Sequence, residues 1–205
     1  MKQEDIEKIH PKAEARVFKP EFKVIEKRSE DGEELELTMI EGVGAVLEEF
    51  TDMGWYREKI NARAFDNCDM SDVVSCFNHD ANKVCSRTTG KADDLTISIE
   101  GNKVMYRYAI KNECAEYVAK DIALGFVKGS SFMFMVRKDS WGEAEDGIEE
   151  REILEIETLY ELGAVTFPAY PTTSVAARSK QAAQQESKPV KKDKYYYKKL
   201  NHKIK

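Results

Sequence analysis

Long stretches of this 205-residue chain alternate apolar and polar residues with a period of two. The alternation is clearest at residues 35–39 (LELTM), at 95–110 around Gly101-Asn102, and at 151–167 (REILEIETLYELGAVTF). A period of two is typical of half-buried β-strands, and a Gly-Asn pair between two such runs indicates a hairpin. The chain is therefore predicted to be mostly β.

One segment has helical spacing instead. In ECAEYVAKDIALGF, residues 113–126, Ala115, Val118 and Ile122 fall on one stripe. Asn112 is suited to cap the start of this helix and Gly125 to end it, and NARAFDN (61–67) indicates a further helical turn. We expect an α+β fold in which a single closed or nearly closed β-barrel is surrounded by a few helices.

Charge divides the chain unevenly. The net charge is −6, but residues 180–205 carry nine lysines against one aspartate and one glutamate, which is +7 and leaves −13 for residues 1–179. An acidic body argues against a nucleic-acid-binding core. We predict a mobile leader over residues 1–20, a folded domain over 21–179 and a disordered basic tail over 180–205, since a run of like charge with little hydrophobicity does not fold.

Several classes of protein are excluded by composition. No window approaches the roughly 20 apolar residues that a membrane-spanning helix needs, and the first residues, MKQEDIEKIH, lack the apolar stretch of a secretory signal. The four cysteines form no CxxC pair, so reduced thiols are expected. These features predict a soluble, intracellular protein.

His79 is the one histidine inside the predicted folded domain, where it follows the short apolar run 73–77. General base catalysis near neutral pH most often uses histidine, although an ordinary hydrogen-bonded histidine at a strand edge fits the same pattern. Cys76 and Cys85 flank it in the sequence at spacings that suggest a zinc site. No fourth ligand has a suitable spacing, so we expect no metal ion and no cofactor.

Two serines, Ser130 and Ser131, follow Gly129 at the start of a bulky strand. A hydroxyl held there could act as a nucleophile, and neighbouring backbone N–H groups could bind an oxyanion, but Gly-Ser-Ser is also an ordinary turn. The following residues, Phe132-Met133, rule out the G-x-S-x-G elbow of α/β-hydrolases.

A carboxylate to orient the histidine could come from the last predicted strand. Glu155, Glu157 and Glu161 share one face by a period of two, and such a row usually faces solvent. Glu161 differs because it lies beside the most apolar stretch, LGAVTFPAY, where a charged carboxylate needs a partner such as an imidazole N–H. Spacing alone leaves open whether serine, histidine and acid meet.

Five segments taken in order resemble a known family: IEGVGAVLEEF, YREKINARAFDN, DVVSCFNHD, KGSSFMF and LYELGAVTFPAYPTTSVAARS. Together, over about residues 22–179, they are similar to the prohead serine proteases of tailed bacteriophages. The resemblance implies a serine endopeptidase with the β-barrel fold of the herpesvirus assembly protease. It implies His79 as the base, Ser131 as the nucleophile with Ser130 at a variable position, and Glu161 as the acid, with Glu157 as the fallback.

The sequence departs from the family pattern in two places. Val84-Cys85-Ser86-Arg87-Thr88 lacks the glycine that relatives often have after the histidine, and Met133 replaces a frequent glycine. Both changes bear on substrate preference more than on the reaction.

The resemblance also implies the partners and the location. The substrates would be the major capsid protein precursor or scaffold, and the protease itself, inside the assembling procapsid in the cytoplasm of the bacterial host. Relatives with this fold include dimers, so a homodimer belongs to the expectation, whereas membrane and nucleic acid are not expected partners. The basic tail would be a solvated end, a tether to an acidic surface or a segment removed by self-cleavage. The alternative function is a non-catalytic capsid assembly or scaffold protein that retains the fold.

Overall fold

The computed structural model describes residues 12–18, 21–28, 35–90 and 95–167. The chain divides into two units, residues 1–171 and 172–205, and all described residues belong to the first. The predicted tail lies outside the described residues, as does the first part of the predicted leader. The strands are β1 (Ala13–Phe18), β2 (Phe22–Arg28), β3 (Leu35–Val46), β4 (Thr51–Asp52), β5 (Tyr56–Ile60), β6 (Val74–Cys76), β7 (Val84–Arg87), β8 (Thr96–Glu100), β9 (Lys103–Ala109), β10 (Gly129–Glu143) and β11 (Glu149–Val165).

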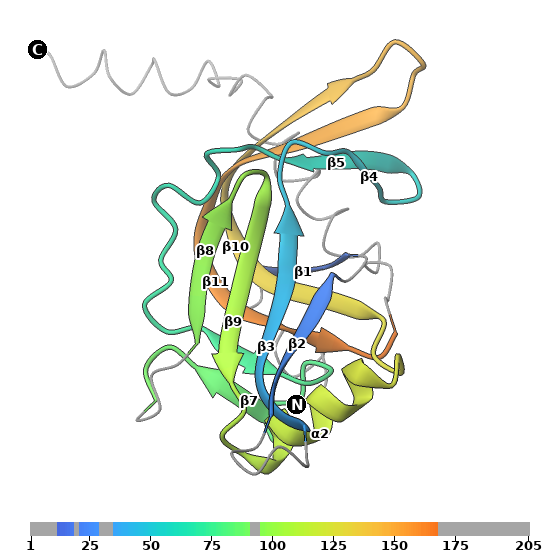
Figure 1. Cartoon of the computed structure of the whole chain (residues 1–205). Helices are drawn as coiled ribbons and strands as arrows, with labels where there is room; N and C mark the ends of the chain where they lie inside the picture. Colours follow the sequence, from blue (N-terminus) through green and yellow to red (C-terminus); the bar gives the residue numbers. More distant parts are fainter. Residues whose placement is uncertain (1–11, 19–20, 29–34, 91–94, 168–205) are drawn as a thin grey trace, which may run out of the picture. The chain divides into compact units, whose positions relative to one another are not determined.

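These strands form two separate sheets. The larger has the order β1-β10-β11-β5-β4, with β6 pairing with both β11 and β7, and the smaller has the order β2-β3-β9-β8. Figure 1 shows the smaller sheet lying across the curved strands β10 and β11. The mostly-β prediction is confirmed, but the single closed barrel is not, because no strand pairing among the described residues joins the two sheets.

The predicted helix is present as α2 (Glu113–Ala123), the one helix with assigned bounds in the described part of the chain. The side chain of Asn112 accepts a hydrogen bond from the N–H of Ala115 at 2.9 Å, as expected of an N-cap. Gly125 follows the helix with φ +74°, a conformation that favours glycine. Ala115, Val118 and Ala119 form its buried face. Among the described residues, no helix has the length and apolar character needed to cross a membrane.

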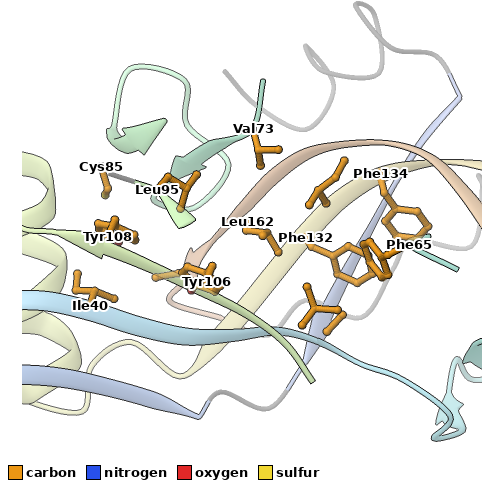
Figure 2. Packing of buried hydrophobic residues seen from close by; sticks show 14 of the residues in the cluster. Ile40, Phe65, Val73, Cys85, Leu95, Tyr106, Tyr108, Phe132, Phe134 and Leu162 are labelled. Carbon is orange, nitrogen blue, oxygen red and sulfur yellow. The ribbon is translucent and has the colours of Figure 1, made fainter. Parts of the chain in front are cut away.

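The core lies between the two sheets. Figure 2 shows Tyr106 of β9 near Leu162 of β11, Tyr108 nearer to Cys85 and Ile40, and Phe132 and Phe134 of β10 beside Phe65. The rings of Phe132 and Phe134 stack with centroids 4.4 Å apart, and both side chains are fully buried. Truncation of such a residue to alanine typically costs about 3–5 kcal/mol. The packing of Phe132 and Phe134 therefore fixes the start of β10 on the face that points into the core.

Strand β1 differs from the sequence expectation. Residues 13–18 were placed in a mobile leader because they show no clear apolar period, yet they pair in antiparallel register with β10, Ala13 opposite Met135 and Val17 opposite Ser131. Two of the inward positions are the charged residues Glu14 and Arg16, both buried. The alternation of buried and partly exposed residues in β1 has no apolar signature in the sequence, because its buried side chains Glu14 and Arg16 are charged.

Candidate active site

The hairpin of β10 and β11 carries two of the three predicted site residues. Ser131 lies opposite Gly163, and Met133 lies opposite Glu161. Directly paired residues share a face, and so do residues two apart in one strand. Ser131 and Glu161 therefore lie on the same face of the hairpin, away from Phe132 and Leu162, which fill the core on the other.

A β-bulge gives Glu161 this position. Leu159 pairs with Phe134 and Glu161 pairs with Met133, so β11 has one extra residue, Tyr160, between these pairs. A bulge shifts the alternation of faces by one. As a result Leu159 points into the core while Glu161, two residues later, does not, and the strict period of two assumed from the sequence fails here.

His79 reaches this face from β6, which pairs with β11 through Val74 opposite Glu161. Asn78 and His79 both have left-handed backbone conformations, with φ of +54° and +56°. Such a conformation is uncommon outside glycine, although asparagine tolerates it better than most residues. The two residues turn the chain back toward β11 after the short strand ends.

Asn78 fixes this turn to the end of β11. Its N–H donates to the carbonyl of Ala164 at 3.0 Å, its Oδ1 accepts from the N–H of Thr166 at 2.8 Å, and its Nδ2 donates to the Thr166 hydroxyl at 3.1 Å. Three hydrogen bonds at one residue specify the local geometry far more narrowly than one would. Asn78 therefore holds His79 beside the carboxylate of Glu161.

Gly163 permits the close approach of this segment. A β-carbon at position 163 would lie 2.1 Å from the carbonyl oxygen of Cys76 and 3.3 Å from its nitrogen. Isolated glycines in strands often mark such a close backbone contact. The site thus depends on a glycine opposite Ser131 that allows the backbone around Cys76 to cross over β11.

His79 and Glu161 are in direct contact. His79 Nδ1 lies 3.0 Å from Glu161 Oε2, and the two side chains are 16% and 8% exposed. Because a carboxylate oxygen accepts hydrogen bonds, Nδ1 carries the hydrogen in this contact, and in the neutral ring Nε2 then presents its lone pair. Burial alone would lower the pKa of His79, but the hydrogen bond and charge of Glu161 raise it overall. The second carboxylate oxygen, Oε1, is buried without a hydrogen-bond partner in the described part of the chain.

Ser131 is buried, and its hydroxyl is engaged elsewhere. Its Oγ donates a hydrogen bond to the carbonyl of Arg16 in β1 at 2.9 Å, and the residue has 0% exposure. The hydrogen bond of the Ser131 hydroxyl therefore points to the neighbouring strand rather than to His79.

Ser130 points to the opposite side. Its Oγ lies 3.2 Å from the hydroxyl of Tyr106 inside the core. The register thus separates the two serines: only Ser131 shares a face with Glu161, whereas Ser130 belongs to the packing between the sheets.

The other sequence candidates lie apart from this arrangement. The carboxylate paired with His79 is that of Glu161, whereas the main-chain carbonyl of Glu157 accepts a hydrogen bond from the N–H of Asp69. No cluster suited to a metal ion occurs among the described residues. All four cysteines are free, and the sulfur of Cys85 lies 3.2 Å from that of Cys114, on the first turn of α2, rather than near His79.

Three residues with a clear structural part here were not singled out from the sequence: Asn78, Gly163 and Arg16. Asparagine directly after a strand was a signal for a left-handed turn, and a glycine within a long strand was a signal for close backbone approach. Nothing in the local pattern pointed to Arg16, because its contacts come from residues far along the chain.

A hydroxyl, an imidazole and a carboxylate on one face are the components from which serine hydrolases are built. The sequence comparison agrees with this class: residues 23–188 match the family described as the caudovirus prohead serine protease. This chain therefore belongs to the caudovirus prohead serine protease family, which confirms the resemblance seen in the sequence. The family connects the chain with proteolysis and with capsid assembly and maturation in phages.

The search of curated proteins found no match. Among solved structures, the chain is similar to the capsid assembly protease of bacteriophage T4, gp21, with 14% sequence identity and a TM-score of 0.42, over 74% of this chain and 98% of that chain. These values are too low to transfer any residue assignment.

Proposed function

We propose that the protein is a serine endopeptidase that cleaves scaffold or capsid precursor segments during procapsid maturation. The single observation that supports this most directly is the 3.0 Å contact between His79 and Glu161 on the face that carries Ser131. An imidazole held by a carboxylate has one defined tautomer and a stabilised cation, as a general base beside a serine requires. Family membership supplies the reaction class.

The proposed mechanism is acyl transfer. Ser131 Oγ bonds to the carbonyl carbon of a substrate peptide while its proton passes to Nε2 of His79. The carbon–nitrogen bond then breaks, and the imidazolium gives the proton to the leaving amine. Water hydrolyses the ester by the same route, and Glu161 stabilises the imidazolium in both halves. Backbone N–H groups near Ser131 would bind the oxyanion.

Family membership supports the substrates and partners that we propose. The major capsid protein precursor or the scaffold would be cut inside the assembling procapsid in the host cytoplasm, and self-cleavage and homodimer formation belong to the same proposal. The protease domain would span residues 21–179. Strand β1, which begins at Ala13, adds to the larger sheet from outside that range.

One observation favours the alternative, a non-catalytic assembly protein. Ser131 has 0% exposure and its hydroxyl is bonded to Arg16. In an enzyme, the hydrogen bond from the Ser131 hydroxyl to Arg16 must break before the hydroxyl can react. A non-catalytic assembly protein can keep this hydrogen bond.

Cleavage in co-expression tests the proposal. Ser131→Ala should leave the capsid precursor uncut, since loss of the nucleophile in a serine protease costs several orders of magnitude in rate. Ser130→Ala is the matched control, because this neighbouring hydroxyl faces Tyr106 in the core. Processing that survives in Ser131→Ala would exclude Ser131 as the nucleophile, and loss of processing only in Ser130→Ala would move the assignment by one residue.

A further inference from the structure

The N-terminal strand β1 lies where a peptide would bind beside the proposed nucleophile. It is an edge strand whose ladder runs along β10 from Met135 to Ser130, and Val17 lies opposite Ser131. An extended substrate commonly binds a protein by adding a strand to a sheet edge, with main-chain hydrogen bonds for affinity. The edge of β10 at Ser131 is therefore the place for such a strand, and β1 occupies it.

The contact at Ser131 is the kind that a bound peptide makes. The hydroxyl of Ser131 donates to the main-chain carbonyl of Arg16, not to a side chain. A peptide carbonyl within hydrogen-bonding reach of the serine hydroxyl is what a substrate strand in the same register would present. While β1 remains there, Ser131 is fully buried, so the strand also blocks the site.

Charged side chains hold β1 in this place. Arg16 Nη2 lies 2.7 Å from Glu58 Oε2, while Arg151 contacts Glu14 at 2.6 and 2.8 Å. All four residues are at most 4% exposed. Buried charges without partners are strongly penalised, so a strand with the wrong charges at these positions would bind poorly.

Two of these four charged residues belong to strands other than β1 and would remain in the sheet if β1 left it. Glu58 belongs to β5 and Arg151 to β11, and they contact each other at 2.9 Å. Arg151 also contacts Asp139 of β10 at 2.6 Å. Without β1, Glu58 and Arg151 would keep each other as partners, yet each would have lost one ion pair. The vacated edge would therefore carry a negative and a positive charge ready to bind complementary ones.

We propose that β1 occupies the place of the substrate strand, and that the protease selects segments in which an acidic and a basic residue, spaced as Glu14 and Arg16 are, contact Arg151 and Glu58. This inference rests on the proposed function and specifies its substrate class. Specificity arises because the two pairs have opposite polarity, so a segment with the charges in reverse order would put like charges together.

Peptide binding to the full-length chain tests the inference without requiring catalysis. In Glu14→Gln/Arg16→Gln the ion pairs of β1 are lost while Glu58 and Arg151 keep each other. We expect faster amide exchange at residues 13–18 in this variant. A fluorescein-labelled peptide KAEARVF, the sequence of residues 12–18, should bind it at least tenfold tighter than KARAEVF, measured by anisotropy. The two peptides have the same composition and net charge, so only charge order differs.

Each result supports or overturns the inference. Equal binding of the two peptides, no binding of either, or unchanged exchange at residues 13–18 would each overturn it. Should the double variant fail to fold, Arg16→Gln alone leaves both glutamates in contact with Arg151 and serves for the same measurements. Glu58→Gln in the same background should remove most of the preference for KAEARVF.

Labelling of Ser131 by a fluorophosphonate separates this inference from the proposed function. We expect the Glu14→Gln/Arg16→Gln variant to react faster than wild type, with Arg107→Gln unchanged because Arg107 lies in the other sheet. A charge-order preference without labelling at Ser131 would leave the strand inference standing and count against the nucleophile. Faster labelling without a charge-order preference would support Ser131 as the nucleophile and overturn the proposed substrate selection by charge.

Discussion

His79 and Glu161 lie 82 residues apart in sequence, and their side chains meet at 3.0 Å. Their contact joins the turn after β6 to the far part of β11. The strength of this pair can be measured through the protonation of His79, because the carboxylate stabilises the imidazolium more than the neutral ring.

Glu161→Gln should lower the pKa of His79. In the wild type, burial lowers this pKa and Glu161 raises it above the ordinary value of 6.5, with the second effect larger. Removing the charge leaves burial to act alone. NMR titration of the histidine ring, assigned with His79→Gln, provides the measurement. Glu157→Gln is the matched control and should change nothing, and an equal fall in that control would refute a specific pair.

The same pair makes stability depend on pH. A histidine whose folded pKa is raised stabilises the fold fully below its ordinary pKa, and this contribution is lost as the pH rises through the folded pKa. The difference in free energy of unfolding between wild type and Glu161→Gln should therefore shrink as the pH rises above about 6.5. Urea unfolding at several pH values would show it.

Gly163→Ala should disturb the site directly. Its new methyl group would lie 2.1 Å from the carbonyl oxygen of Cys76, so the backbone before His79 must move. Overpacking of this kind costs about 1–3 kcal/mol. Gly142→Ala in the same hairpin is the matched control, because nothing lies within 4 Å of its β-carbon position. Denaturant unfolding should show a lower free energy of unfolding for Gly163→Ala than for Gly142→Ala. Equal values would show that the backbone at Cys76 moves away from the new methyl group without a cost in stability.

Asn78→Gly should loosen His79 without straining the backbone. Glycine accepts the φ of +54° but loses both side-chain hydrogen bonds to Thr166. Each such bond contributes about 0.5–1.5 kcal/mol, and the pKa of His79 should fall toward its ordinary value as contact with Glu161 weakens. Thr166→Val, which removes only the hydroxyl partner, should have a smaller effect on both. An unchanged His79 titration in Asn78→Gly would mean that Asn78 does not position the ring.

Strand β1 should loosen at acidic pH. Burial alone would raise the pKa of Glu14, but Arg16 and Arg151 hold it at about 2, below its ordinary 4.5. A carboxylate with a depressed pKa stabilises the fold above its ordinary pKa, and the contribution is lost as the pH falls through the folded value. Amide protection of residues 13–18 should therefore decline between about pH 4.5 and 2.

Arg16→Gln should move that decline to higher pH, because one of the two cations beside Glu14 is gone. Arg57→Gln, which loses ion pairs near the surface with Asp146 and Glu150 and leaves the partners of Glu14 intact, should not change the pH of this decline. A decline at the same pH in wild type and Arg16→Gln would show that the charge of Arg16 does not hold Glu14 ionised.

Much of the fold could be predicted from local patterns. The alternation of apolar residues located β9 and most of β11, and the spacing of Ala115 and Val118 located α2, because half-buried strands and helices bury one regular face. The closed barrel was wrong because strand pairing depends on long-range register, which alternation does not contain.

The site was less accessible to prediction. The bulge at Tyr160 reverses the faces of β11, and only the opposing strand reveals it. Likewise the buried charged side chains of β1 are those of Glu14 and Arg16. Their partners lie far along the chain: Glu58 is 42 residues beyond Arg16, and Arg151 is 137 residues beyond Glu14. Residues that depend on distant partners in this way leave no local signal.

The pairing of β1 with β10 and of His79 with Glu161 also sets an order during synthesis. The first strand made has no partner until residues 129–135 have left the ribosome, and His79 has none until residue 161 has followed. Synthesis proceeds at about 5–20 residues per second. A nascent chain therefore holds no assembled histidine–carboxylate pair until Glu161 has left the ribosome, whereas the strand that covers Ser131 has been made before that serine.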